Sequence, residues 1–128
     1  MKTAAAVLAA ALLTAPATAC EPPLAGPGVQ RIDGSGHVVA WRAPQPVPLA
    51  QFFTLEFAAC ARSGDRIEAP RVEATMPQHG HGMNYRPTVE SLGGGRFRAG
   101  GLLLHMPGRW QLSFNVGGET LRAVLTVD

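Results

Sequence analysis

The sequence is poor in lysine and has only a small surplus of positive charge. Lys2 is the only lysine among eleven Lys and Arg residues, and nine Asp and Glu residues nearly balance them. The arginines are scattered along the chain, so the sequence predicts no basic patch for nucleic acid or for an anionic membrane. Beyond Leu13 no apolar run is long enough for a transmembrane helix. No stretch shows the helical period of about 3.6 residues.

Catalytic groupings are also missing. Asp65, Glu68 and Glu73 are spread over predicted turns and outward faces, and no two acids are placed for acid–base work. Ser63 and Ser91 lie in predicted turns with no hydrolase motif around them. The sequence therefore predicts a protein that is not an enzyme.

The N-terminus has the parts of a secretory signal. Lys2 supplies positive charge, and the apolar run of residues 4–13 is too short to span a bilayer. Ala17-Thr18-Ala19 fits the small-residue pattern of a cleavage site. We therefore expect residues 1–19 to be removed. The remaining chain is then about 110 residues, the size of one domain, and is periplasmic or otherwise exported.

Two cysteines, Cys20 and Cys60, remain after that cleavage. In an oxidising compartment they are expected to form a disulfide that ties the new N-terminus to the third strand. An alternative stays open, because bacterial lipoproteins carry a diacylglyceryl anchor on a cysteine at the first mature position. Residues 17–19 match the lipoprotein signal only loosely. Cys60 would then be a free thiol, and the anchor would be the chain's only attachment to a membrane.

Short alternating segments fill the rest of the chain. Residues 20–28 are rich in Pro and Gly and are expected to form an irregular tether. In residues 29–128, apolar and polar side chains alternate between frequent turn signals. The expected strands cover residues 29–32, 37–42, 51–59, 71–76, 84–90, 96–106, 110–116 and 121–127. This pattern is typical of an all-β, immunoglobulin-like antiparallel sandwich of about seven strands.

Single residues refine this prediction. Pro87 favours an edge position for the strand at 84–90, because proline donates no backbone hydrogen bond. Gly100-Gly101 predicts a bulge within the strand at 96–106.

Three further side chains can be placed from the pattern. Trp110 begins the strongest alternating face and is expected in the core. Tyr85 is expected to pack across the sandwich. His37, isolated near a strand start, is expected in solvent.

Two fragments concentrate the sulfur and imidazole side chains. MPQHGHGM (residues 76–83) holds two histidines and two methionines, and HMPG (residues 105–108) repeats the Met-Pro step. Every methionine beyond residue 1 lies in these fragments. If the first fragment is extended, His79, His81 and Met83 project to one side, because residues two apart share a face.

These donors favour copper over other metals. Thioethers are soft ligands that select Cu(I), whereas imidazole suits both copper and zinc. Zinc has little need of methionine, so the mixture predicts a copper site. The candidate ligands are His79, His81, Met83 and Met106, followed by Met76 and His105.

Two other interpretations stay open. Met76 and Met106 each continue the apolar, inward face of an alternating segment, as core residues do. Methionine also commonly fills gaps in a core. The Gly-His-Gly-Met run is then only a shaped turn. Alternatively, the fragments shape a docking surface for another protein.

Taken together, the fragments resemble a known family. Met-Pro-x-x-Gly-His-Gly-Met at 76–83, Gly-Arg-Phe at 95–97 and an apolar segment running into Met-Pro-Gly-Arg-Trp at 106–110 are similar to the YtkA-like domain, which is related to FixH. The resemblance covers residues 52–127. The positions that match the family's pattern are Met76, His81, Met83 and Met106.

The resemblance implies an exported or membrane-anchored β-sandwich. FixH-type relatives accompany copper-handling and oxidase-assembly proteins of the envelope, which are the implied partners. The chain departs from the pattern at His79, where methionine is common, and at His105, where the residue varies. Both departures add an imidazole. The resulting hypothesis is a Cu(I) carrier or oxidase-assembly accessory of the periplasm. The alternative is a non-catalytic envelope interaction module with no metal.

Overall fold

The structure, a computed structural model of the chain, describes residues 1–12 and 20–128. Residues 1–12 have no regular secondary structure. The expected cleavage pattern at 17–19 lies outside the described residues. Within the described residues, no helix combines the length and the apolar character needed to cross a membrane.

From residue 20 onward the described chain forms nine strands and one 3₁₀ helix. The elements are β1 (Gln30–Asp33), β2 (His37–Arg42), β3 (Phe53–Ala61), β4 (Arg71–Met76), η1 (Pro77–His79), β5 (His81–Gly82), β6 (Thr88–Gly93), β7 (Arg96–Leu102), β8 (Gly108–Val116) and β9 (Glu119–Val127). Residues 20–29, which include the predicted tether, are irregular.

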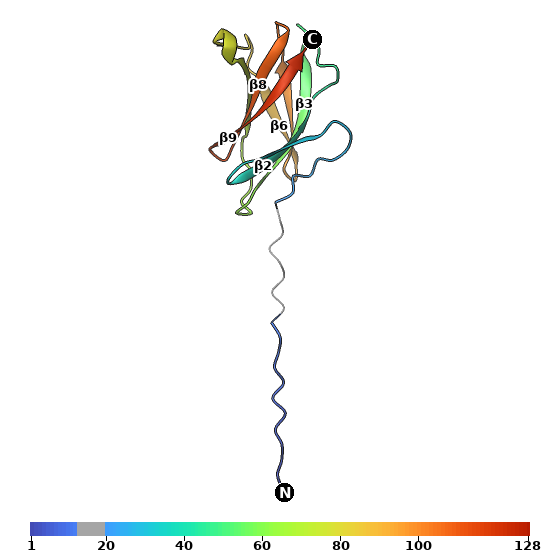
Figure 1. Cartoon of the computed structure of the whole chain (residues 1–128), viewed down its shortest axis with the longest axis vertical. Helices are drawn as coiled ribbons and strands as arrows, with labels where there is room; N and C mark the ends of the chain where they lie inside the picture. The colour runs from blue at the N-terminus through green and yellow to red at the C-terminus, as the bar shows by residue number, and fades with distance from the viewer. Residues whose placement is uncertain (13–19) are drawn as a thin grey trace.

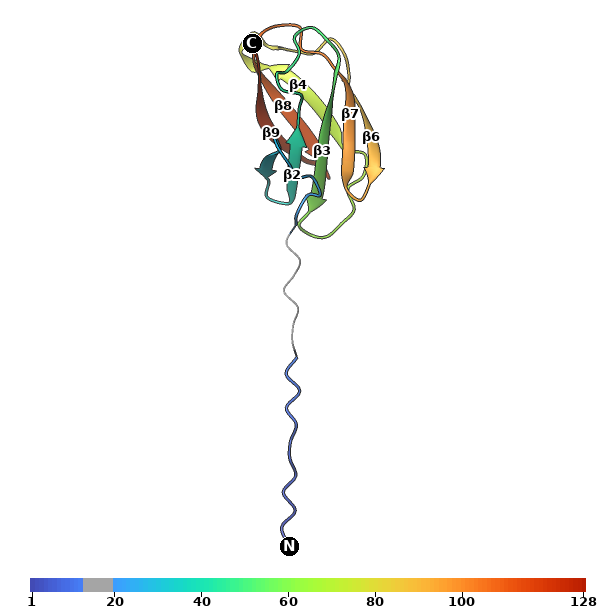
Figure 2. The ribbon, with the colours of Figure 1, turned by 90° about the vertical axis from the view of Figure 1, so that its right-hand side faces the viewer.

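The strands form two antiparallel sheets that pack face to face (Figure 1, Figure 2). One sheet has the order β1-β2-β3-β7-β6 and the other has the order β5-β4-β8-β9. The arrangement β2-β3-β7-β6 against β4-β8-β9 is that of an immunoglobulin domain, with β1 and β5 added at edges. The predicted all-β sandwich is confirmed.

Alternation along the strands decides which side chains enter the core. On β8 the side chains of Trp110, Leu112, Phe114 and Val116 are at most 1% exposed, and those between them face outward. Burying a large apolar side chain contributes about 1.5–3 kcal/mol. The prediction that Trp110 belongs to the core is therefore confirmed.

The strand predicted at 96–106 is too long. The predicted bulge at Gly100-Gly101 is confirmed, because the register shifts where β7 pairs with β3. However, β7 ends at Leu102, and residues 103–107 form a loop. Leu104 continues the apolar pattern without being in a strand, since its side chain is buried and its carbonyl accepts a hydrogen bond from the Ala50 N–H at 2.8 Å.

The strand predicted at 84–90 is displaced toward the C-terminus. β6 begins at Thr88, directly after Pro87, and it is an edge strand as predicted. Tyr85 therefore lies outside the sheet. Its side chain is 49% exposed and meets the Phe52 ring edge to face, with centroids 4.9 Å apart. The expectation that Tyr85 packs across the sandwich is wrong.

The antiparallel order brings both His/Met fragments to one end of the sandwich. β4 ends at Met76 where β8 begins, because Thr75 pairs with Gln111. The loop at 103–107 enters β8 at this same end, beside η1 (Figure 1). The fold therefore gathers the candidate ligands near one another.

Candidate metal centre

The first His/Met fragment turns back on itself instead of running extended. Pro77 begins η1 directly after β4, and Gly80 adopts a left-handed conformation with φ of 66°. The Gly80 N–H donates to the Met76 carbonyl oxygen at 3.1 Å and closes the turn. His79 is thus in the turn, so the segment is not extended, and the condition under which His79, His81 and Met83 would share one face is not met.

After the turn, the chain pairs with the strand it has just left. Met76 is the cross-strand partner of His81, and the Met83 N–H donates to the Ala74 carbonyl oxygen at 3.2 Å. Directly paired residues share a face of a sheet. The side chains of Met76 and Ala74 are buried, so His81 and Met83 also face the inside of the sandwich end, where both are partly buried.

The two fragments meet at their imidazoles. The ring centroids of His81 and His105 are 5.2 Å apart, with the planes inclined by 35°. His79 also stacks on His81, with ring centroids 5.8 Å apart, but the His79 side chain is exposed. His81 therefore contacts both of the other histidine rings.

Trp110 contacts two of these histidine rings from the core. Its ring meets His81 edge to face at 5.9 Å and His105 at 5.5 Å. Its Nε1–H donates to the Met106 carbonyl oxygen at 3.0 Å. The sequence placed Trp110 in the core but missed its contact with both histidines. The sequence feature that pointed to this contact was the Met-x-Gly-x-Trp spacing at 106–110, which puts Trp110 shortly after His105.

Nitrogen atoms suited to a metal remain on both paired histidines. His81 Nδ1 lies 3.2 Å from the Gly82 carbonyl oxygen. A carbonyl only accepts, so Nδ1 is the donor of this hydrogen bond, and in the neutral tautomer with that donor Nε2 carries the lone pair. His105 Nδ1 is buried and has no hydrogen-bond partner among the described residues. Such a buried, unpaired polar atom calls for a ligand or a water.

The three methionines differ in how deeply they are buried. Met83 and Met106 are partly buried and pack against the rim of the core. Met76 is only 3% exposed, and its Cε lies where a side chain on Gly108 would be. Met76 therefore fills space in the core, as the structural interpretation of this methionine predicts.

No group of three or more His, Cys, Asp or Glu side chains that could hold a metal ion is found among residues 1–12 and 20–128. Two imidazoles converge, but no carboxylate or thiolate joins them. A metal bound here would need thioethers to complete its coordination.

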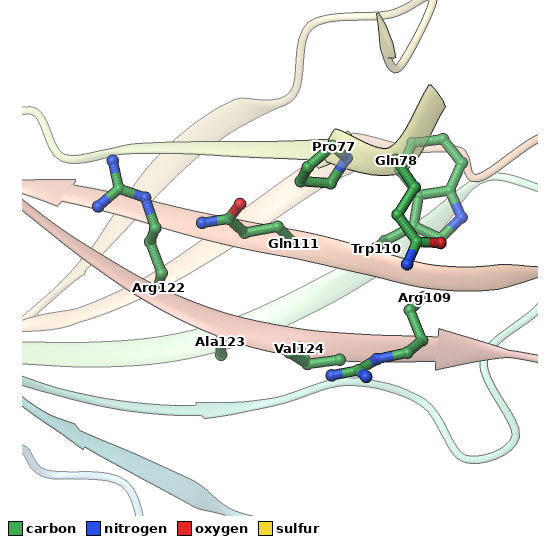
Figure 3. Close-up of a pocket in the computed structure, with 8 residues that line it drawn as sticks. All are labelled: Pro77, Gln78, Arg109, Trp110, Gln111, Arg122, Ala123 and Val124. Carbon is green, nitrogen blue, oxygen red and sulfur yellow. The ribbon is translucent and has the colours of Figure 1, made fainter. Parts of the chain in front are cut away.

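A groove of about 360 Å³ lies beside η1 on the outer face of β8 and β9 (Figure 3). Its main lining residues are Pro77, Gln78, Arg109, Gln111, Arg122 and Val124. The sequence did not reveal this groove, because its residues come from three elements that only the sheet register brings together.

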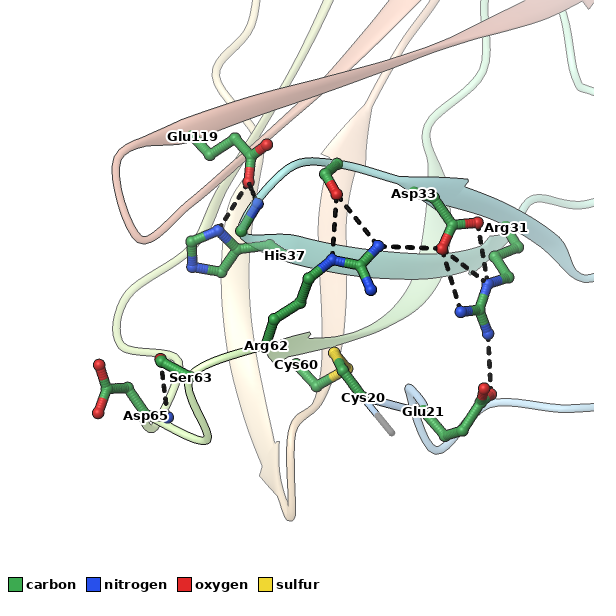
Figure 4. Close-up of a disulfide and its surroundings, with 12 residues drawn as sticks. Cys20, Glu21, Arg31, Asp33, His37, Cys60, Arg62, Ser63, Asp65 and Glu119 are labelled. Atoms are coloured by element: carbon green, nitrogen blue, oxygen red, sulfur yellow. Dashed lines mark hydrogen bonds and ion pairs between the residues drawn. A yellow bond between two sulfur atoms is a disulfide. The ribbon is translucent and has the colours of Figure 1, made fainter. Parts of the chain in front are cut away.

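The opposite end of the sandwich holds the disulfide between Cys20 and Cys60, with their Cα atoms 5.8 Å apart (Figure 4). This is the first of the two alternatives that the sequence left open. A thioether-linked lipid on Cys20 would require the same sulfur atom, so the disulfide and the anchor exclude one another.

His37 lies at this end too, and the prediction that it is in solvent is wrong. Its side chain is 15% exposed, and Nδ1 lies 2.8 Å from Glu119 Oε1. Gly117, in the turn between β8 and β9, lies against the ring and leaves no room for a side chain there. The hairpin turn therefore covers a histidine that looked isolated.

Glu119 joins the turn between β1 and β2 to the start of β9. Besides its bond with His37 (Figure 4), the Glu119 carboxylate accepts hydrogen bonds from the Ser35 N–H at 2.8 Å and the Gly36 N–H at 3.0 Å. The hydrogen bond from His37, helped by those from Gly36 and Ser35, lowers the pKa of Glu119 to about 2, although desolvation opposes the shift. Each hydrogen bond favours the charged form.

Comparisons of this chain with models of known families, with curated proteins and with solved structures found no match. The resemblance to YtkA-like domains therefore stays a prediction, which rests on the residues at 76–83 and 95–110.

Proposed function

We propose that the protein binds copper as Cu(I) at the end of the sandwich and serves as an exported carrier or an accessory to oxidase assembly. His81 and His105 supply the imidazole nitrogens, and Met83 and Met106 supply thioethers. His79, which is exposed beside His81, is a ligand that can join from solvent. Met76 has mainly a packing role.

One observation carries this proposal. His81 and His105 come from separate segments and lie 5.2 Å apart, and the buried His105 Nδ1 has no hydrogen-bond partner among the described residues. Leaving such an atom unpaired costs about 1–3 kcal/mol. A soft cation between the rings would remove this cost and bind the free Nε2 of His81.

The remaining donors favour copper over zinc. Structural zinc prefers four ligands drawn from thiolates, imidazoles and carboxylates, and among the described residues no three such groups are already arranged to hold a metal ion. Thioethers are the additional donors available, and they select Cu(I). Two imidazoles and one or two thioethers make a neutral site, suited to holding a monovalent cation.

Anaerobic titration of Cu(I) in competition with a chromophoric chelator tests the proposal on the disulfide-bonded chain from residue 20. We expect the protein to withdraw one Cu(I) from micromolar chelator. The double variant H81A/H105A should bind at least about a hundredfold more weakly. H37Q is the matched control, since His37 lies at the other end of the sandwich, and it should bind like the parent protein.

Either of two results would overturn the proposal: failure of the parent protein to compete for Cu(I) at micromolar chelator, or competition by H81A/H105A that equals that of H37Q. Near-ultraviolet circular dichroism of each variant establishes that the sandwich is intact.

A second candidate is an interaction module without metal, and one observation favours it. Phe52 and Tyr85 are 60% and 49% exposed and contact each other, and Leu49, three residues before Phe52 in the sequence, is 41% exposed. Exposed apolar groups that gather at one place are typical of protein docking sites. Crosslinking in the periplasm should then depend on Phe52 and Tyr85 but not on His81 or His105.

A further inference from the structure

The outer faces of the two sheets differ in how their arginines are paired. On the five-stranded sheet, Arg31, Arg42 and Arg98 each form an ion pair with a carboxylate, and only Arg96 forms none with a described residue. On the four-stranded sheet, Arg71, Arg109 and Arg122 form no ion pair with any described residue. Arginines that are scattered in the sequence therefore leave more unpaired positive charge on one outer face than on the other.

Arg109 and Arg122 lie at opposite ends of the groove beside η1 (Figure 3). In the ladder between β8 and β9, Arg109 pairs with Thr126 and Arg122 pairs with Ser113, which places them four residue steps apart. At about 3.3 Å for each residue, the separation along the strands is about 13 Å. This separation between the backbone positions suits two anionic groups better than a single small anion.

The middle of the groove has a different character. Val124 is 51% exposed, and Pro77 forms the apolar wall opposite it. The side-chain amide of Gln111 lies between the two arginines, and that of Gln78 lies near Arg109 (Figure 3). The groove thus offers positive ends, an apolar middle and amides that can bind a backbone.

Few carboxylates compensate this charge. Glu73 on β4 belongs to the same outer face, in line with Ser113 and Arg122 through the ladder, and Asp128 directly follows β9. Neither forms an ion pair with Arg109 or Arg122. Both arginines keep their hydrogen-bond donors available for a ligand.

We propose that this groove binds an extended acidic segment of a partner polypeptide, in which two carboxylates four residues apart contact Arg109 and Arg122. Residues at i and i+4 of an extended chain are about 13 Å apart and share a face with the residue at i+2. An apolar side chain at i+2 then packs on Val124 and Pro77. Guanidinium groups bind carboxylates through paired, charge-assisted hydrogen bonds.

The proposal does not depend on copper and is tested on the metal-free, disulfide-bonded chain by NMR. The probe is a blocked heptapeptide with glutamate at its second and sixth positions, leucine at the fourth, and glycine or serine elsewhere. We expect its addition to shift the backbone amides of Gln111 and Val124 and the Nε–H signals of Arg109 and Arg122. The double variant R109Q/R122Q should weaken binding at least about fivefold.

Three controls separate this proposal from simple charge attraction. The variant R96Q/R98Q removes the same charge from the other sheet and should bind normally. A peptide with the two glutamates adjacent should bind several-fold more weakly, and one with glutamines in their place should not bind. Equal binding by the adjacent-glutamate peptide, equal weakening in R96Q/R98Q, identical shifts from inorganic phosphate, or no shifts at millimolar peptide would each overturn it.

Discussion

Trp110 donates a hydrogen bond from its indole Nε1–H to the backbone carbonyl oxygen of Met106, with 3.0 Å between the two atoms. This bond holds the loop that carries His105 and Met106 against the beginning of β8. Because the same ring contacts His81 and His105, one side chain links the core of the sandwich to the candidate site.

Replacing Trp110 by phenylalanine should therefore loosen the loop as well as reduce packing. Trp41 provides a matched control, because it is also buried and its Nε1 has no hydrogen-bond partner among the described residues. Both W110F and W41F remove similar volume, but only W110F loses a hydrogen bond. We expect W110F to lower the free energy of unfolding by about 1 kcal/mol more than W41F in urea denaturation. Equal losses would show that the bond to Met106 contributes nothing.

Glu119 should make the stability of the fold depend on pH in the acid range. Its pKa is lowered to about 2 in the folded protein, below the ordinary value for a glutamate of about 4.3. A lowered pKa contributes stability that is fully present above the unfolded pKa and is lost as the pH falls through the folded pKa. We expect E119Q to be less stable than the parent at pH 6, with the difference shrinking as the pH approaches 2.

Glu90 offers the comparison for that prediction, since it makes only an exposed pair with Arg98 at 3.7 Å. E90Q should change stability little at any pH. Chemical denaturation at a series of pH values measures both variants. A constant difference between E119Q and the parent from pH 6 to pH 2 would contradict the assignment.

The disulfide between Cys20 and Cys60 closes a loop with a sequence separation of 40 residues. The chain-entropy model gives such a bond about 4 kcal/mol of stabilisation. The C20S/C60S variant should lose about that amount in urea denaturation. Intact-mass measurement of the protein from its native envelope should show the oxidised chain beginning at Cys20, and a mass increased by a diacylglyceryl group would favour the lipoprotein alternative.

The thioethers should distinguish copper from zinc. M83L and M106L keep the apolar volume but remove a soft donor, so each should weaken Cu(I) binding while leaving the weak Zn²⁺ binding of the imidazoles unchanged. M76L is the matched control, because Met76 packs against Gly108 in the core. Chelator competition with each metal measures the three variants. A larger loss of Cu(I) affinity in M76L than in M106L would show that Met76, and not Met106, is the thioether ligand.

Local alternation was sufficient to predict most of the fold. β4 begins and ends where the alternating residues do, and the inward face of β8 from Trp110 to Val116 follows from its period of two. β2 also has the predicted bounds, although its four middle residues are all buried. The pattern failed where an apolar side chain is buried without being in a strand. Leu104 has this property, and the prediction therefore carried β7 through residues 103–106.

The arrangement of the candidate site depends on which strands pair and in which register, and alternation of apolar residues does not predict either. His81 faces inward because it pairs with Met76 after the turn at Gly80, and neither the turn nor the register follows from spacing. The contact with His105 further requires that β4 and β8 be neighbours. The bond from His37 to Glu119 likewise joins residues that only the packed hairpins bring together.

The claim that His81 and His105 bind one cation together is tested most directly by long-range ¹H–¹⁵N NMR of the histidine side chains during anaerobic Cu(I) addition. The account predicts that the ring nitrogens of His81 and His105 shift together and reach their endpoint at one equivalent, while His37, engaged with Glu119, keeps its position. Shifts confined to the exposed His79, or no shift at His105 at one equivalent, would contradict it.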